Sequence, residues 1–178
     1  MKYLLWLLPL LFSPATIAQT FPDDWLGNSE GEMHIGNVDS HRTDTIPVTL
    51  EFQTEIEDSA WSYKMTYNSE QFGMVVKDYK IRATKSGDTK KLLLDENNSI
   101  VMEMSLMNGT MYGMYEVLGT LFITTLKFEE EEEALYFDLF GASMSNPTET
   151  STIEDGEEYK ATSYRTQFHQ SVLLRKVE

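Results

Sequence analysis

The 178-residue sequence contains no cysteine, which excludes disulfide bonds, thiol catalysis and cysteine-ligated metal sites. A bacterial lipoprotein anchor is excluded for the same reason, because it needs a cysteine just after the leader. Basic residues are also scarce: 14 Lys and Arg stand against 29 Asp and Glu, giving a formal net charge of −15. Such a charge repels phosphate backbones and anionic membrane surfaces, so we expect no nucleic-acid partner. It is typical of a protein that stays soluble outside the cytoplasm.

Long apolar runs are missing too, except at the start of the chain. Lys2 precedes the apolar run 4–12, and small residues follow at 15–18, as in a secretory signal. The run is shorter than the ~20 residues that span a bilayer. We therefore predict a signal peptide over 1–18, with cleavage after Ala18 or Gln19; an uncleaved anchor is the alternative. The mature protein is then periplasmic or secreted, without membrane insertion, and 19–178 fits a single domain.

Apolar and polar residues alternate with a period of two through most of the remaining chain. Within 45–57, Ile46, Val48 and Leu50 alternate with Thr49 and Glu51, which is typical of a strand with one dry and one wet face. Asn108-Gly109 is a strong signal for a two-residue hairpin turn. The predicted strands cover 31–35, 45–57, 60–67, 75–83, 90–95, 99–106, 110–118, 120–128, 134–140 and 164–177.

This pattern predicts an all-β fold. Short links between consecutive strands favour an antiparallel up-and-down β-barrel of about 8–10 strands, lipocalin-like, whose closure removes exposed strand edges. An open or two-sheet arrangement is the alternative. Two polar stretches fall outside the pattern: we expect 36–44 to be a loop or short helical cap, and 145–160 to be a long mobile loop.

The stretch Gly27-Asn28-Ser29-Glu30-Gly31 matches G-x-S-x-G, the pattern of a serine nucleophile elbow. That elbow requires a buried strand before the serine, a helix after it and an α/β sheet around it. Here only residues 19–26 separate the match from the predicted export signal over 1–18, and a strand pattern follows. We therefore interpret the match as accidental and predict that the protein is not an enzyme.

The residues around this match have another interpretation. Trp25 and the segment Leu26-Gly27-Asn28-Ser29-Glu30-Gly31 resemble the first strand of calycin-type barrels, notably the L-G-x-W-x-G form of nitrobindin-like proteins. Ser29 stands where that form has its Trp. The resemblance implies that a Trp plugs one end of a closed barrel, and it implies haem as a candidate cofactor, held by His169 in the final strand. Alternation, however, places His169 opposite to Phe168 and Val172, on the outside.

The main functional hypothesis is a binding protein that encloses a small apolar or amphipathic molecule. Inward aromatic and thioether side chains would line the cavity and tyrosine hydroxyls would provide polar contacts. The expected ligand-binding residues are Trp61, Tyr63, Tyr67, Tyr79, Met102, Met104 and Phe122. Small barrels can also be filled by their own side chains, so the alternative is an envelope interaction or structural module with no ligand. A cavity above roughly 300 Å³ would favour the binding protein.

A haem or copper carrier is the third hypothesis. Methionines cluster in one predicted hairpin, and thioethers bind Cu(I), so Met111 and Met114 join His169 as weak metal candidates. Methionine is more often an adaptable core side chain. The three histidines are too dispersed for a zinc site, so no metal site is predicted beyond these candidates.

Overall fold

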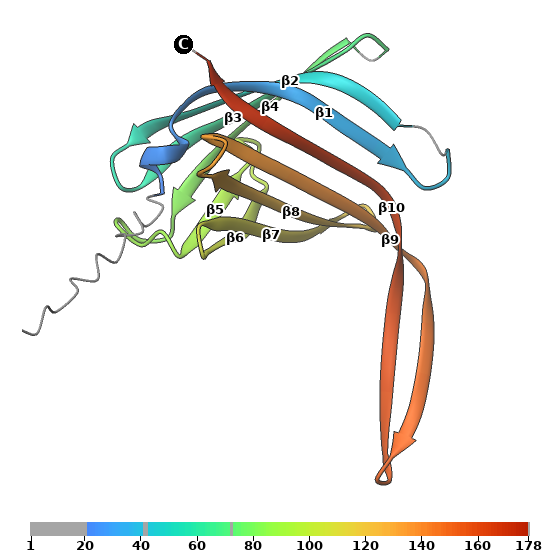
Figure 1. Ribbon diagram of the computed structural model, residues 1–178. Helices are drawn as coiled ribbons and strands as arrows, with labels where there is room; N and C mark the ends of the chain where they lie inside the picture. Colours follow the sequence, from blue (N-terminus) through green and yellow to red (C-terminus); the bar gives the residue numbers. More distant parts are fainter. Residues whose placement is uncertain (1–20, 41–42, 72, 178) are drawn as a thin grey trace, which may run out of the picture.

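The computed structural model describes residues 21–40, 43–71 and 73–177, so the predicted signal peptide lies outside the described residues. Ten antiparallel strands form one closed barrel in which each strand pairs with its neighbours in sequence and the last pairs with the first (Figure 1). The predicted all-β, up-and-down barrel is confirmed. The described residues contain no helix long and apolar enough to cross a bilayer. The strands are β1 (Gly27–Asn37), β2 (Thr43–Ile56), β3 (Ala60–Ser69), β4 (Gly73–Ala83), β5 (Lys91–Asp95), β6 (Val101–Met107), β7 (Thr110–Val117), β8 (Thr120–Glu129), β9 (Ala134–Glu154) and β10 (Glu157–Val177).

Alternation along each strand decides which side chains enter the barrel. In β2, Val48, Leu50 and Phe52 are almost fully buried, whereas Thr49 and Glu51 between them are more exposed. Because successive side chains of a strand point to opposite faces, a shift of one residue would turn every apolar group outward. The pattern therefore fixes the register of the strand as well as its existence.

Closure of the barrel depends on a glycine in β1. A Cβ placed on Gly31 would overlap the carbonyl oxygen of Leu173 in β10 and lie 2.8 Å from Cγ2 of Val172. The backbones of the first and last strands can therefore come this close only where a side chain is missing. The outer residues of the same pair of strands continue the ladder, with Glu30 opposite Arg175 and His34 opposite Ser171.

One end of the barrel is filled by aromatic side chains. The short 3-10 helix η1 (Asp23–Trp25) precedes β1 and brings Trp25, which is 1% exposed, over the interior. The ring of Phe21 lies 5.1 Å from that of Trp25, 6.2 Å from Phe52 and 5.0 Å from Trp61, all in edge-on arrangements. We call this group, Phe21, Trp25, Phe52 and Trp61, the aromatic plug. Its packing leaves this end of the barrel closed.

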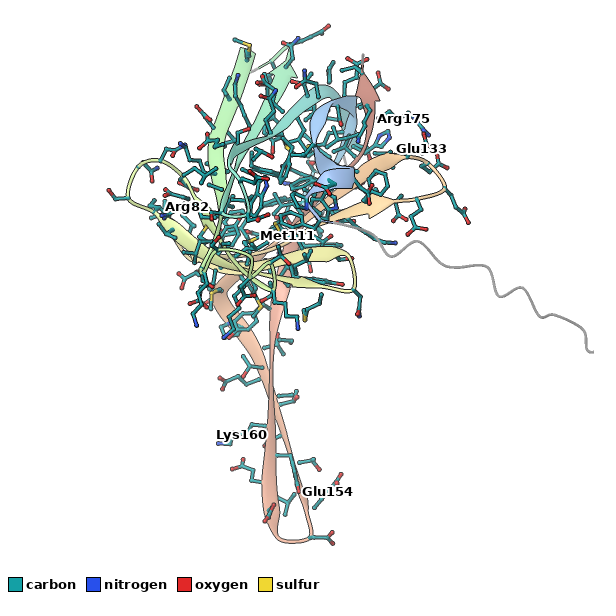
Figure 2. All side chains as sticks on the ribbon, turned by 90° about the vertical axis from the view of Figure 1, so that its left-hand side faces the viewer. Arg82, Met111, Glu133, Glu154, Lys160 and Arg175 are labelled. Carbon is teal, nitrogen blue, oxygen red and sulfur yellow. The ribbon has the colours of Figure 1, made fainter. Side chains whose placement is uncertain are left out.

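The opposite end carries the largest departure from the expected structure. The stretch 145–160, expected to be a mobile loop, forms the distal parts of β9 and β10, which pair as a two-stranded ribbon (Figure 1). We call residues 145–166 the arm, and every one of its side chains is exposed. Asp155-Gly156 turns the ribbon with φ values of 52° and 84°, similar to the 50° and 72° of Asn108-Gly109. Figure 2 shows the arm, with Glu154 and Lys160, standing clear of the dense side chains of the barrel.

Candidate functional site

The inward side chains of β3 are tightly packed at one end of the strand and border open space at the other. Trp61 belongs to the aromatic plug and is 1% exposed. Tyr63, Met65 and Tyr67 follow on the same face and border an internal cavity, and Ser69 borders an open vestibule beyond it. One strand thus leads from a packed end to a hollow end.

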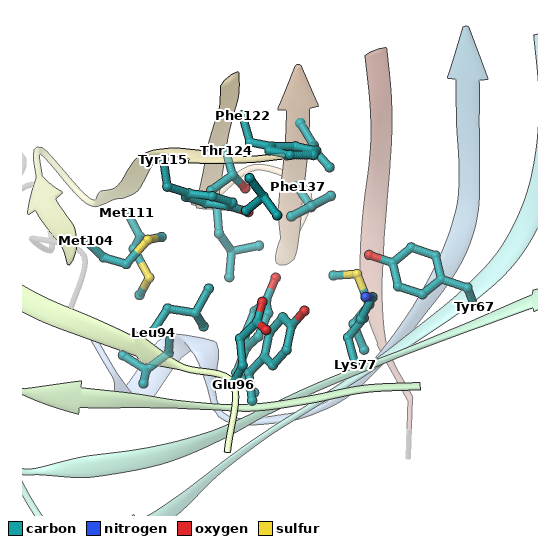
Figure 3. Close-up of a pocket in the computed structure, with 17 residues that line it drawn as sticks. Tyr67, Lys77, Leu94, Glu96, Met104, Met111, Tyr115, Phe122, Thr124 and Phe137 are labelled. Atoms are coloured by element: carbon teal, nitrogen blue, oxygen red, sulfur yellow. The ribbon is translucent and has the colours of Figure 1, made fainter. Parts of the chain in front are cut away.

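The cavity has a volume of about 240 Å³ and lies inside the hollow half of the barrel (Figure 3). Its apolar wall residues come from β3 to β9, and they are Met65, Ile81, Leu94, Met104, Met111, Val117, Phe122, Leu126, Phe137 and Leu139. Its polar wall residues are Tyr63, Tyr67, Lys77, Tyr79, Glu96, Tyr115 and Thr124. A mostly apolar wall with a few convergent polar groups is typical of a small-molecule site.

Burial keeps the tyrosine hydroxyls of the cavity protonated. Desolvation raises the pKa of Tyr63, Tyr67, Tyr79 and Tyr115 above the ordinary tyrosine value. The negative charge of Glu96 adds to this effect at Tyr79 and Tyr115, and the Tyr79 hydroxyl also hydrogen-bonds to Glu96. At neutral pH these four hydroxyls are therefore neutral, and those of Tyr63, Tyr67 and Tyr115 can donate a hydrogen bond to a ligand, since the Tyr79 hydroxyl donates to Glu96.

The aromatic rings of the wall form two stacked pairs. Tyr63 and Tyr79 have centroids 6.5 Å apart and planes inclined by 10°, and Tyr115 and Phe122 have centroids 5.6 Å apart and planes inclined by 20°. In Figure 3, Tyr115 and Phe122 lie on one side of the cavity and Glu96 lies on the other. An occupant of the cavity would therefore lie between the Tyr115–Phe122 pair and the Glu96 carboxylate.

The vestibule outside the cavity is larger and more open, with a volume of about 700 Å³. Tyr67, Lys77 and Leu139 border both spaces, so they form the boundary between them. The remaining vestibule residues include Ile35 and Gln170, from the strands that close the barrel. A molecule can therefore approach the cavity from the end of the barrel opposite to the aromatic plug.

The structure places the seven predicted ligand-binding residues in two groups. Tyr63, Tyr67, Tyr79, Met104 and Phe122 line the cavity. Trp61 and Met102 are buried in the core but do not line it; Trp61 belongs to the aromatic plug. Strand alternation identified inward side chains correctly, but it contains no information on how far along the barrel axis each one lies.

Twelve of the seventeen wall residues were not among the predicted ligand-binding residues, and Lys77, Tyr115 and Glu96 show why. Lys77 has the same parity in β4 as Tyr79, so strict alternation would have turned it inward despite its charge. Tyr115 lies in β7, whose sequence is mixed on both faces, although Met111 and Tyr115 share parity. Glu96 follows β5 in a segment that the sequence marks only as a turn, so no sequence signal points to it.

The candidate metal ligands do not meet in the structure. Met111 is 1% exposed and faces the cavity, whereas Met114 is 70% exposed on the outside of the same strand. His169 lies on the outside as its parity predicted: its Nε2 is 2.6 Å from Oδ1 of Asp138, and its ring stacks on Phe140 with centroids 4.4 Å apart. Among the described residues, no three His, Asp or Glu side chains are grouped closely enough to hold a metal ion. The haem and copper hypotheses stay predictions.

The G-x-S-x-G match lies within β1 rather than at a turn between a strand and a helix. Ser29 is 2% exposed and points into the barrel, while His169 lies on the outer surface. A serine and a histidine on opposite faces of the barrel wall cannot share a proton. Tyr136 donates a hydrogen bond of 3.1 Å to Asp138, which occupies that carboxylate together with His169 on the outer face.

Comparison with known proteins supports the fold alone. No protein-family model matches the chain, and no curated protein matches it. A solved structure of a protein of unknown function from the DUF3598 family of Nostoc punctiforme PCC 73102 matches with a TM-score of 0.57 and 11% identity, over 87% of this chain and 48% of that one. Rv2717c from M. tuberculosis matches with a TM-score of 0.41 and 10% identity, over 87% and 94% of the two chains. This chain therefore spans about half the length of the first of these structures.

Proposed function

We propose that this protein is an exported, non-enzymatic binding protein that encloses a small apolar or amphipathic molecule in its barrel. The observation that carries the proposal is the internal cavity of about 240 Å³, which adjoins the vestibule at Tyr67, Lys77 and Leu139. The cavity alone is somewhat smaller than the ~300–1,000 Å³ of typical ligand sites. Its occupant is therefore a compact molecule, or a longer one whose second part extends into the vestibule.

Enclosure is the mechanism that this wall supports. Removing apolar area of the ligand from water contributes about 25 cal/mol per Å². The neutral hydroxyls of Tyr63, Tyr67 and Tyr115 would orient polar atoms of the ligand by donating hydrogen bonds. Export is supported by the apolar run and the small residues at the start of the sequence.

The test is binding of N-phenyl-1-naphthylamine, a neutral apolar dye whose fluorescence rises on transfer out of water. We expect saturable binding to the mature protein, and we expect native mass spectrometry of the protein from its own host to show a bound small molecule. Leu139→Trp, at the boundary between cavity and vestibule, should weaken dye binding at least about tenfold, which corresponds to about 1.4 kcal/mol.

The matched control is Phe140→Trp, one residue further along β9 on the outer face, which should bind the dye as the wild type does. Equal binding by the wild type and Leu139→Trp would locate the dye elsewhere and contradict the proposal. Urea unfolding of both variants checks that a change in binding does not result from a loss of folded protein.

The exposed arm favours a second candidate function, an interaction module of the cell envelope. No side chain of the arm is buried, and residues 149–158 include Glu149, Glu154, Asp155, Glu157 and Glu158. A two-stranded ribbon is marginally stable alone in water, so a partner would stabilise it. If deletion of the arm abolishes the activity of the protein in its host while Leu139→Trp does not, this candidate replaces the binding protein.

A further inference from the structure

The aromatic wall of the cavity offers ring faces rather than only apolar surface. The stacked pairs Tyr63–Tyr79 and Tyr115–Phe122 lie at the cavity, and Tyr67 stands at its boundary with the vestibule. The face of an aromatic ring carries negative electrostatic potential, and it attracts a cation held within about 6 Å of its centre. A cavity walled by several such rings is therefore better suited to a cation than a cavity walled by aliphatic groups.

A carboxylate completes this wall. Asn98 Nδ2 donates a hydrogen bond of 3.1 Å to Oε2 of Glu96, and the Tyr79 hydroxyl also bonds to this carboxylate, so both neighbours hold its orientation. Within the described part of the chain, none of the salt bridges involves Glu96. A carboxylate accepts about four hydrogen bonds, so capacity remains for a ligand that donates.

The cation of the wall, Lys77, has a different position. It borders both the vestibule and the cavity and is exposed, whereas Glu96 borders the cavity only. The protein as a whole carries a formal charge of −15, which raises the local concentration of cations and speeds their association. The net negative charge of the protein and the carboxylate of Glu96 at the cavity wall therefore both favour a cationic ligand.

We propose that the cavity binds a small organic cation, a primary ammonium on a compact apolar or aromatic group, with Glu96 as its counterion and the tyrosine rings as its walls. This inference rests on the proposed binding function and names its ligand class. The ammonium donates hydrogen bonds to the Glu96 carboxylate, and its apolar group lies between the ring pairs Tyr63–Tyr79 and Tyr115–Phe122.

The experiment compares three probes of nearly equal shape by isothermal titration calorimetry: 2-phenylethylammonium, the neutral 2-phenylethanol and the anionic 3-phenylpropanoate. We expect the wild type to bind the ammonium about tenfold more tightly than the alcohol, and the carboxylate most weakly. Glu96→Gln keeps the shape of the side chain but removes its charge, so it should lower ammonium affinity to that of the alcohol. Affinity for the alcohol should stay unchanged in this variant.

Two further variants separate the wall charge from the overall charge. Glu103→Gln removes one negative charge from the outer face of β6, and it should preserve the wild-type preference for the ammonium. Lys77→Met should preserve or strengthen ammonium binding, because it removes a like charge from the boundary of the cavity.

The possible outcomes separate a failure of the cation inference from a failure of the proposed binding function. If the alcohol or the carboxylate binds as tightly as the ammonium, the cation inference is overturned and the binding function stands. If the wild type binds 3-phenylpropanoate and Lys77→Met does not, the ligand is anionic; the cation inference is then overturned and the binding function stands. An ammonium preference that survives Glu96→Gln would overturn the role of Glu96. If none of the probes, nor N-phenyl-1-naphthylamine, binds the wild type, the binding function fails and this inference fails with it.

Discussion

The two ends of the barrel are built from the same ten strands but are filled in different ways. At one end, Trp25, Phe52 and Trp61 are at most 1% exposed and pack around Phe21. At the other end, tyrosines surround the cavity and the vestibule opens beyond it. At the packed end the rings contact one another edge-on, and the buried indole N–H groups of Trp25 and Trp61 have no hydrogen-bond partner among the described residues. At the hollow end the tyrosine hydroxyls border open space that a polar partner can enter.

The two ends of the barrel therefore have different roles. Side-chain contacts at the aromatic plug stabilise the closed barrel, whereas the hollow end can bind and release a ligand without unfolding of the barrel. Stability is not uniform across a protein, and binding sites are drawn from its less stable parts. The comparison predicts that substitutions at the plug cost far more free energy of unfolding than comparable ones at the cavity.

Trp61→Ala is expected to have the largest effect. Truncating a fully buried Trp removes its packing on Phe21 and leaves a void, which costs about 3–5 kcal/mol of unfolding free energy. Tyr115→Ala, at the wall of an existing cavity, should cost less than about 2 kcal/mol because fewer packed contacts are lost. Urea unfolding followed by tryptophan fluorescence and circular dichroism measures both. Equal losses would remove the distinction between the two ends.

Gly31→Ala and Gly36→Ala test the same contrast within β1. An added methyl group at Gly31 overlaps the Leu173 carbonyl near the packed interior, and it should cost about 1–3 kcal/mol by separating β1 from β10. At Gly36, nearer the vestibule, a Cβ meets no atom within 4 Å. Gly36→Ala should therefore leave stability unchanged within about 0.5 kcal/mol. A Gly31→Ala protein as stable as Gly36→Ala would mean that the close approach is not required.

The sequence predicted the strands of the barrel well, because the barrel wall imposes alternation. Each barrel strand has one buried and one solvent-exposed face, so apolar and polar residues alternate along it, as at Val48, Thr49 and Leu50. The strands of the arm were not predicted because both of their faces are exposed to solvent, so apolar and polar residues do not alternate in their sequence. Its turn was nevertheless visible: Asp155-Gly156 has the same chemistry as Asn108-Gly109, which did predict a hairpin.

The candidate site was predictable only in part. Alternation shows which residues point inward, but the division between the plug and the cavity depends on axial position, which needs the stagger of all ten strands. Trp61 and Tyr63 are therefore equivalent in the sequence and different in the structure. Glu96 lies outside any strand, so no rule of periodicity applies to it.

The buried tyrosines of the hollow end should make the free energy of unfolding decrease at alkaline pH. Burial raises the folded-state pKa of Tyr63 above its unfolded value near 10, so the folded state keeps a proton that the unfolded state loses. Stability should therefore be constant with respect to this group below about pH 9 and fall above pH 10, by about 1.4 kcal/mol per pH unit for each such tyrosine.

Unfolding free energies of the wild type and Tyr63→Phe between pH 8 and pH 11 check this dependence. Tyr63→Phe should have the smaller slope above pH 10, because it removes one of the retained protons. Tyr159→Phe, in the exposed arm, serves as the control and should keep the wild-type slope. Identical slopes for all three proteins would show that the tyrosines of the cavity are not shielded from water.

The arm extends from the hollow end, and its removal should have the smallest effect of all. Replacing 146–162 by Asn-Gly, between Ser145 and Ser163, removes only exposed side chains and keeps a turn suited to a hairpin. The unfolding free energy should change by less than about 0.5 kcal/mol, because no apolar surface is lost from the core. Affinity for N-phenyl-1-naphthylamine should also stay unchanged, because none of the arm residues lines the cavity or the vestibule. A loss of several kcal/mol would mean that the arm holds β9 and β10 in register, and the hollow end would then contribute to stability as the plug does.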